Sequence, residues 1–276
     1  MAVVQAAGEA GRRAVLAELR ARLAPSGESA ASPQQGWSFG YVALDEALPA
    51  RAAEHGRLHE IVFAHSGDQA AATGFAAALA LRLAGADTVF WCQRTEDRRE
   101  AGRLYGPGIA ALGGDATRFI HVCVRRDVDV LWAMEEAIAS GAVPVVVGEA
   151  ARIDLTASRR LALAAEKSDV TALFLRPSAG SLSNAAWTRF LVAPAPSAPN
   201  PFDARAPGCP RFFLTLQRAR TGIGAAGTLS RPCLVEWNHE THCFAMAAPL
   251  ADRTPPVAQP AYPAGRLELV RQRRSA

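Results

Sequence analysis

The sequence predicts an α/β protein in which helices flank a mostly parallel sheet, with an antiparallel C-terminal extension and flexible N- and C-terminal tails. Apolar runs of strand length alternate with helix-length segments between residues 58 and 193. Most of these runs are apolar at every position, which is typical of parallel strands covered on both faces. After residue 193 the strand patterns follow one another without helices between them, which favours antiparallel pairing.

Composition favours a globular protein of the cytoplasm. Half of the 276 residues are hydrophobic, and no apolar run is long enough to cross a membrane. The five cysteines are odd in number and widely spaced, which favours free thiols in a reducing compartment. Cys92 and Cys123 lie in apolar runs, and we expect both to be buried. The net charge of +4 permits weak DNA binding, so we expect a cytoplasmic, nucleoid-associated protein.

Three parts are predicted along the chain: an N-terminal helix and linker over residues 1–36, a core domain over 37–248 and a disordered tail over 249–276. Residues 10–24 have an apolar residue at every fourth position with arginines between, the pattern of an amphipathic helix. This helix can pack on its own domain or bind a partner, and the sequence supports both equally. Pro- and Gly-containing residues 25–36 separate it from the core.

The centre of the core is a strand, a turn and a helix over residues 58–83. The predicted strand covers residues 58–63, and an apolar run at 61–64 meets a turn at 65–67. An alanine-rich helix follows over 69–83. A P-loop would lie at this turn, with glycines to wrap phosphate, a lysine for the outer phosphates and a Ser or Thr for Mg²⁺. Gln69 and Ala70 occupy the lysine and hydroxyl places, and Lys167 is the only lysine in the chain.

This turn is therefore predicted to be a degenerate nucleotide loop. We expect that the protein is not an enzyme, that it binds no ATP or Mg²⁺, and that it has no metal site. Glu149 ends the most apolar strand, over 143–149, and completes the candidate site. Residual anion binding at the N–H of Gly67 stays open, although Asp68, the expected N-cap of the helix, would compete with phosphate. The candidate positions are Ser66, Gly67, Asp68, Gln69, Ala70 and Glu149.

The other core elements follow from periodicity and from turn residues. Asp127 and Thr156 are the predicted N-caps of two helices. We expect a loop over residues 218–228. The predicted elements are a helix at 44–48, strands at 88–92 and 119–124, helices at 127–140 and 153–166, a strand at 170–175, a helical turn at 182–187, and strands at 190–192, 212–216, 233–237 and 242–246.

Several other polar residues receive structural assignments. His239 and His242 would point to opposite faces of a strand, so we expect no metal site there. His59 and Glu60 are expected to be structural, and His121 a hydrogen-bonded core residue. Paired arginines at 98–99, 125–126 and 159–160 are predicted to be solvated.

A short basic segment near the C-terminus is a predicted docking peptide. Its apolar residues follow a Pro- and Ala-rich stretch, where they have no core to join. The predicted partner-binding residues are Arg266, Leu267, Leu269, Val270, Arg271, Arg273 and Arg274.

Two runs of the core resemble the RecA-type ATPase core. Residues 56–62 (GRLHEIV) are similar to the run that leads into the phosphate loop of that family, and residues 142–149 (AVPVVVGE) to the strand that carries its Mg²⁺-associated acid. Over most of its length the chain is similar to the ImuA family, sometimes grouped with SulA-like proteins. The similar features include the arginine-rich N-terminal helix, the turn at 105–108 (YGPG) and the strands around Glu236-Trp237 and His242.

The resemblance implies a RecA-like accessory protein of damage-induced, error-prone translesion DNA synthesis in the SOS response. The implied partners are ImuB, an error-prone C-family DNA polymerase and RecA. An ATPase or DNA-binding protein with a RecA-like core and a SulA-like inhibitor of cell division are the alternatives. The short connections expected at 150–154 and 178–183 speak against strand exchange.

Overall fold

The computed structural model describes residues 36–48, 53–96, 102–178, 184–200, 202–203, 205–220, 229 and 231–247. The contacts divide the chain between Trp37 and Ser38, and the unit that starts at Ser38 holds every strand described below. The predicted N-terminal helix, the loop residues 221–228 and the C-terminal tail lie outside the described residues. No helix in the described ranges combines the length and apolar character that crossing a bilayer requires.

A nine-stranded sheet forms the frame of the described unit, in the order β3-β2-β4-β5-β1-β6-β7-β8-β9. The neighbours from β3 to β6 are parallel, and those from β6 to β9 are antiparallel, which confirms the predicted fold class. The strands are β1 (Leu58–Phe63), β2 (Val89–Arg94), β3 (Phe119–Val124), β4 (Val145–Glu149), β5 (Thr171–Pro177), β6 (Thr188–Ala195), β7 (Arg211–Ala219), β8 (Cys233–Asn238) and β9 (Cys243–Met246). The helices are α2 (Val42–Asp45), η1 (Ser66–Asp68), α3 (Gln69–Ala84), α5 (Gly106–Ala111), η2 (Ala116–Arg118), α6 (Asp127–Ser140) and α7 (Leu155–Ser168).

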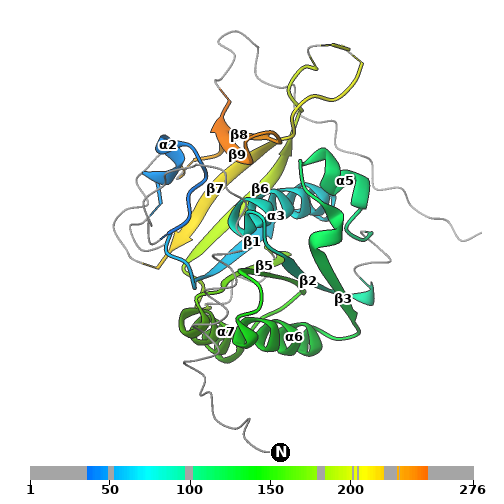
Figure 1. Cartoon of the computed structure of the whole chain (residues 1–276). Helices are drawn as coiled ribbons and strands as arrows, with labels where there is room; N and C mark the ends of the chain where they lie inside the picture. The colour runs from blue at the N-terminus through cyan, green and yellow to red at the C-terminus, as the bar shows by residue number, and fades with distance from the viewer. Residues whose placement is uncertain are drawn as a thin grey trace, which may run out of the picture. The chain divides into compact units, whose positions relative to one another are not determined.

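One face of the sheet is covered by α3 and α5, and the other by α6 and α7 (Figure 1). Helix α3 is buried almost all round, because its many alanines let it lie close to the strands. Beside α3 the antiparallel strands close over a cluster of edge-to-face and tilted rings. These rings belong to Phe39, Phe75, Phe190, Phe212, Trp237 and Phe244.

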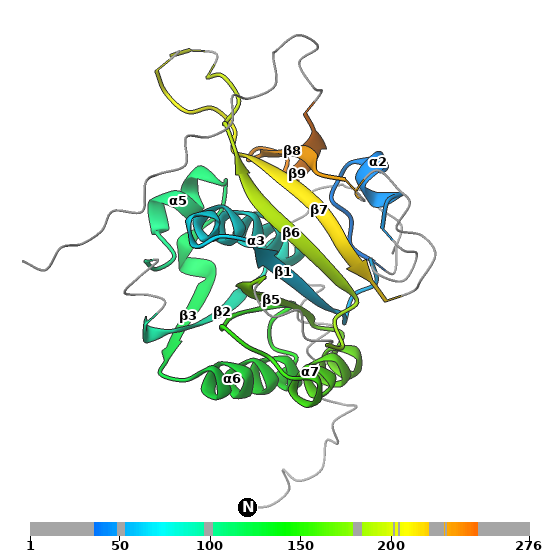
Figure 2. The ribbon, with the colours of Figure 1, turned by 180° about the vertical axis from the view of Figure 1, so that it is seen from behind.

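The opposite core lies between the parallel strands and the helices α6 and α7, seen from behind in Figure 2. Val130, Met134 and Ile138 follow the helical repeat and point their side chains into it. Gly148 in β4 leaves room for this layer, because a Cβ there would lie 2.0 Å from the Sδ of Met134. All five cysteines are free. Cys92 is buried as predicted, but Cys123 is only half-buried because its strand β3 is the sheet edge.

Strands β5 and β6 lie on either side of β1, and both are bonded to a buried carboxylate of β1. Glu60 in β1 accepts hydrogen bonds from Arg176 Nε, from Asn184 Nδ2 at 2.8 Å and from Arg189 Nε at 2.5 Å. Its side chain is 1% exposed, and the two arginine side chains are 4% and 9% exposed. Glu60 is therefore structural, as predicted.

The predicted helical turn at 182–187 is wrong for residues 184–187, which are irregular. Two of their backbone groups bond to distant partners. The Trp187 N–H donates to the Leu58 carbonyl at 2.8 Å, and Arg218 Nη2 donates to the Asn184 carbonyl at 2.6 Å. Arg218 thus lies in β7, which continues to Ala219, where the sequence predicted a loop.

Both predicted helix caps are displaced. Asp127 is the first residue of α6 and not its N-cap, and its carboxylate accepts the Arg152 N–H at 3.1 Å and pairs with Arg94 Nε at 3.1 Å. The N-cap of α7 is Asp154, whose Oδ1 accepts the Ala157 N–H at 2.7 Å, so Thr156 lies inside the helix. Gly141 ends α6 in the left-handed conformation, as expected from its position.

Candidate functional site

The loop after β1 is a single 3₁₀ turn that runs directly into α3. The N–H of Asp68 donates to the His65 carbonyl at 2.9 Å, which closes the turn. Asp68 holds the N-cap position of α3 but makes no side-chain cap to that helix. Its carboxylate instead accepts the His65 N–H at 3.3 Å. The Asp68 carboxylate thus already accepts a hydrogen bond from a backbone N–H of this turn, where the N–H groups of a P-loop would donate to phosphate.

Gly67 shows no conformational need for glycine. Its φ is outside the left-handed region, and a Cβ built on it would meet nothing within 4 Å. P-loop glycines let backbone N–H groups curve around a phosphate, whereas the residues Ser66–Asp68 form a helical turn. Gln69 and Ala70 are the first two residues of α3. The amide of Gln69 stands in place of the P-loop lysine, and the methyl group of Ala70 stands in place of the Ser or Thr hydroxyl.

Glu149 ends β4 beside the end of β2, and it is 5% exposed. The indole Nε1 of Trp91 donates to Glu149 Oε1 at 2.5 Å. Gln93, the neighbour of Glu149 in register, is held at both ends of its amide. Its Oε1 accepts from His121 Nε2 at 2.6 Å, and its Nε2 donates to the Gly102 carbonyl at 3.2 Å. The polar floor of the site, formed by Gln93 and Glu149, is therefore already engaged in hydrogen bonds within the chain.

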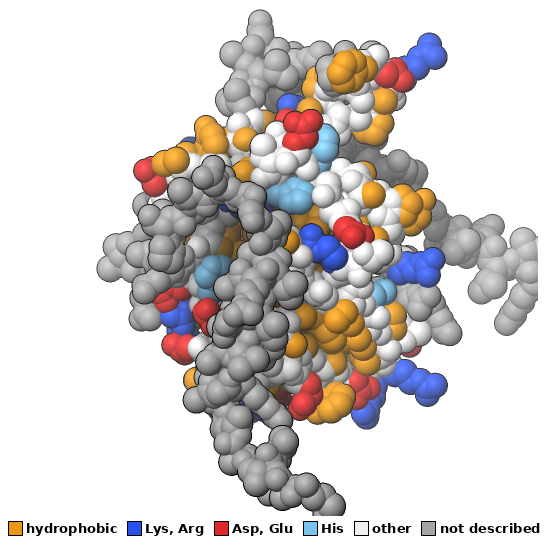
Figure 3. Space-filling model, in the orientation of Figure 1, with side chains coloured by type: hydrophobic (Ala, Val, Ile, Leu, Met, Phe, Trp, Pro, Cys, Tyr) orange, Lys and Arg blue, Asp and Glu red, His pale blue; other side chains and the backbone are white. Residues whose placement is uncertain are grey.

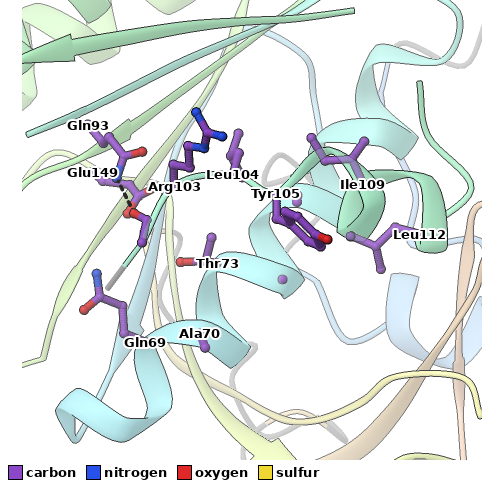
Figure 4. Close-up of a pocket in the computed structure, with 14 residues that line it drawn as sticks. Gln69, Ala70, Thr73, Gln93, Arg103, Leu104, Tyr105, Ile109, Leu112 and Glu149 are labelled. Carbon is purple, nitrogen blue, oxygen red and sulfur yellow. Dashed lines mark hydrogen bonds between the residues drawn. The ribbon is translucent and has the colours of Figure 1, made fainter. Parts of the chain in front are cut away.

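A cavity of about 350 Å³ opens above this floor, between α3 and the segment that contains α5 (Figure 4). Gln69, Ala70 and Glu149 line it as candidate site residues, whereas Ser66, Gly67 and Asp68 do not. Sequence reasoning missed the rest of the lining, and most of it lies on the wall opposite α3, in a segment known only for its turn at 105–108. The added residues are Thr73, Gly74, Ala77, Gln93, Gly102, Arg103, Leu104, Tyr105, Gly108, Ile109 and Leu112.

Two arginines lie near Gln69 and Glu149 in a second hollow of about 50 Å³, and both are paired. Arg94 forms an ion pair with Asp127, and Arg176 with Glu60. Neither is a spare cation that would take over the role of a P-loop lysine.

Three histidines of the described residues, His59, His121 and His242, have structural partners. His59 Nδ1 lies 2.8 Å from Thr188 Oγ1, and burial together with the charge of Arg57 lowers the pKa of His59 to about 3. His242 stacks on Trp237, and its Nε2 lies 2.9 Å from the Gly113 carbonyl oxygen. In the part of the chain that the structure describes, no three His, Cys, Asp or Glu residues are grouped as a metal site would need.

Charges of both signs alternate on the visible described surface, without a continuous basic field (Figure 3). Several surface arginines are in ion pairs, for example Arg126 with Asp129 at 2.7 Å and Arg160 with Glu135 at 2.6 Å. These two pairs agree with the predicted solvated arginines. The predicted docking residues between Arg266 and Arg274 lie outside the described residues.

No family model matches the chain. Among solved structures, the crystal structure of SulA from Pseudomonas aeruginosa is similar over 44% of this chain and 98% of its own, with a TM-score of 0.36 and 16% identity. Protein ImuA from two strains of Caulobacter vibrioides is 33% identical to this chain over 231 residues, which cover 78% of this chain and 90% of the relative. At that identity and coverage, the chain belongs to the ImuA family.

Proposed function

We propose that this chain is a non-catalytic accessory protein of damage-induced translesion synthesis, which brings ImuB and an error-prone DNA polymerase together. Membership of the ImuA family supports the pathway. In this proposal the RecA-like core is a scaffold, RecA is a further partner in the cytoplasm, and DNA contributes weak contacts at most.

The geometry after β1 is the single observation that carries the non-catalytic part. A P-loop stabilises the transferring phosphate with a lysine and with curved backbone N–H groups, and each such group contributes several kcal/mol at the transition state. Here Gln69 replaces the lysine, the backbone forms a 3₁₀ turn, and Asp68 adds a negative charge. Glu149 supplies an acid, but acid alone does not stabilise the negative charge of a phosphate.

The test is damage-induced mutation frequency in a strain that lacks this protein and is complemented by variants. Wild-type protein and Glu149→Gln are both expected to restore mutagenesis, because glutamine keeps an oxygen acceptor for Trp91. If Glu149→Gln abolishes mutagenesis and also removes a measured ATP turnover, the protein is an ATPase. If the deletion leaves mutation frequency unchanged and overexpression makes cells filament, the division-inhibitor alternative is correct.

Partner binding is tested with the full chain by co-purification with ImuB. We propose that the C-terminal segment contributes, through the apolar side chains of Leu267 and Leu269 between arginines. The double variant Leu267→Asp/Leu269→Asp is expected to lose ImuB, and Val257→Asp, a matched apolar change in the same tail, is expected to keep it. Retention of ImuB by the double variant would move the contact to another surface.

A further inference from the structure

The cavity beside α3 lies near the ends of β2 and β4, two neighbouring strands after which the chain continues on opposite faces of the sheet. After β2 it enters the segment of α5 on the side of α3, and after β4 it enters α7 on the other side (Figure 1). Open parallel sheets bind ligands at such a switch point, outside the carboxyl ends of the strands. The volume of about 350 Å³ is at the small end of the range for ligand pockets.

The polar groups of the cavity fall into two sets. Gln93 and Glu149, on the floor, are engaged in the hydrogen bonds described above. Thr73, Arg103 and Tyr105, on the walls, make no side-chain hydrogen bond or ion pair with another described residue. Of these three, only Arg103 carries a charge, so the cavity offers one cationic group to a ligand.

The rest of the lining is apolar and includes one exposed ring. Leu104, Ile109, Leu112 and the alanines of α3 form most of the wall. The Tyr105 side chain lines the cavity on the wall opposite α3, and the residue is 67% exposed (Figure 4). A flat apolar body would stack on this ring and cover it.

We propose that the cavity binds a small aromatic monocarboxylate, with its ring on Tyr105 and its carboxylate paired with Arg103. A guanidinium holds a carboxylate by two parallel charge-assisted hydrogen bonds, which gives both orientation and affinity. A nucleoside triphosphate does not suit the same lining, because three phosphates would meet one arginine and the buried acid Glu149. This inference does not rest on the proposed role in translesion synthesis.

Phenylacetate carrying a fluorine on its ring is a suitable probe, observed by fluorine NMR with the full-length protein. We expect saturable binding with a Kd of about 1 mM or tighter. The uncharged analogue, phenylacetamide with the same fluorine, is expected to bind about tenfold more weakly or worse, because it lacks the charge-assisted contacts. Weaker or non-saturable binding of the acid overturns the proposal, as does displacement of the probe by Mg–ATP at lower concentration than unlabelled phenylacetate.

Two variants locate the binding. Arg103→Gln is expected to weaken binding of the acid about tenfold or more and to leave the amide unaffected. Ala70→Leu fills the cavity from an exposed helix position and is expected to remove binding of both probes. Arg159→Gln and Ala139→Leu, at exposed positions on other helices, are matched controls that keep wild-type affinity. Circular dichroism checks that all four variants fold, and unchanged binding in both cavity variants contradicts the proposed site.

Discussion

The indole of Trp91 donates a hydrogen bond to the carboxylate of Glu149 at 2.5 Å, so the acid at the end of β4 is tied into the core. The residue that resembles the Mg²⁺-associated acid of RecA-type ATPases therefore has a structural partner. Both side chains are buried, and a buried polar group that loses its partner costs free energy.

This contact predicts different stabilities for two substitutions at position 149. Glu149→Gln keeps an acceptor oxygen and should change the free energy of unfolding by less than about 1 kcal/mol. Glu149→Leu leaves the Trp91 N–H without this acceptor and should destabilise the protein by about 1–3 kcal/mol. Urea denaturation followed by tryptophan fluorescence measures both, and equal effects would contradict the structural role of the bond.

Glu60 holds two buried arginines, and its removal should be costly. Glu60→Gln removes the charge that compensates Arg176 and Arg189, so the free energy of unfolding should fall by about 3–5 kcal/mol. Glu136→Gln, on the exposed side of α6, is the control and should stay within about 0.5 kcal/mol of wild type. A loss below about 1 kcal/mol for Glu60→Gln would mean that the network adds little to stability.

Replacement by alanine should affect stability differently at two glycines. Gly67→Ala adds a methyl group in open space at an ordinary φ and should change stability by less than about 0.5 kcal/mol. Gly148→Ala places its Cβ against Met134 in a filled core and should cost about 1–3 kcal/mol. Thermal unfolding of the two variants side by side is the measurement, and a large loss for Gly67→Ala would show that the loop needs glycine after all.

His59 should make stability depend on pH. Its pKa is about 3 in the folded protein, against 6.5 for an unperturbed histidine, so between these values the unfolded chain binds a proton that the folded chain does not. This residue therefore contributes a loss of stability as pH falls through that window, by at most about 1.4 kcal/mol per pH unit.

The measurement compares wild type with His59→Asn by urea denaturation from pH 8 to pH 4. The difference in free energy of unfolding between the two proteins should be constant above about pH 7. Below that pH, wild type should lose stability more steeply than the variant. Parallel curves over the whole range would contradict a buried, neutral His59.

Local patterns were sufficient for most of the fold. Strand β1 and helix α3 were predicted closely, because burial leaves an apolar run at the end of β1 and a nearly continuous apolar stretch in α3. The cap of α6 was displaced because Asp127 has distant partners, Arg94 and the Arg152 N–H, which no local rule includes. The cap of α7 was misplaced by two residues, because Asp154 and Thr156 are both suitable N-cap residues.

The candidate site was predicted only in part, for a physical reason. Two parts of the site, the turn at Ser66–Asp68 and the acid Glu149, belong to motifs that can be recognised in the sequence. The cavity wall at Arg103 and Tyr105 comes from a segment whose position depends on long-range contacts, such as the bond from Trp237 Nε1 to the Leu112 carbonyl at 3.0 Å. The partners of Glu60 are likewise spread over three later segments, so their meeting is a property of the fold.

The closed turn after β1 also constrains evolution. In the pattern G-x-x-x-x-G-K-[ST], placing Gln69 at the lysine puts Phe63 and Asp68 at the two glycines. Phe63 is 5% exposed, and its loss alone would cost about 3–5 kcal/mol, comparable with the whole stability of many domains. Restoring the full P-loop pattern would need several simultaneous changes, and replacing Phe63 by glycine would by itself remove much of the stability on which the fold depends.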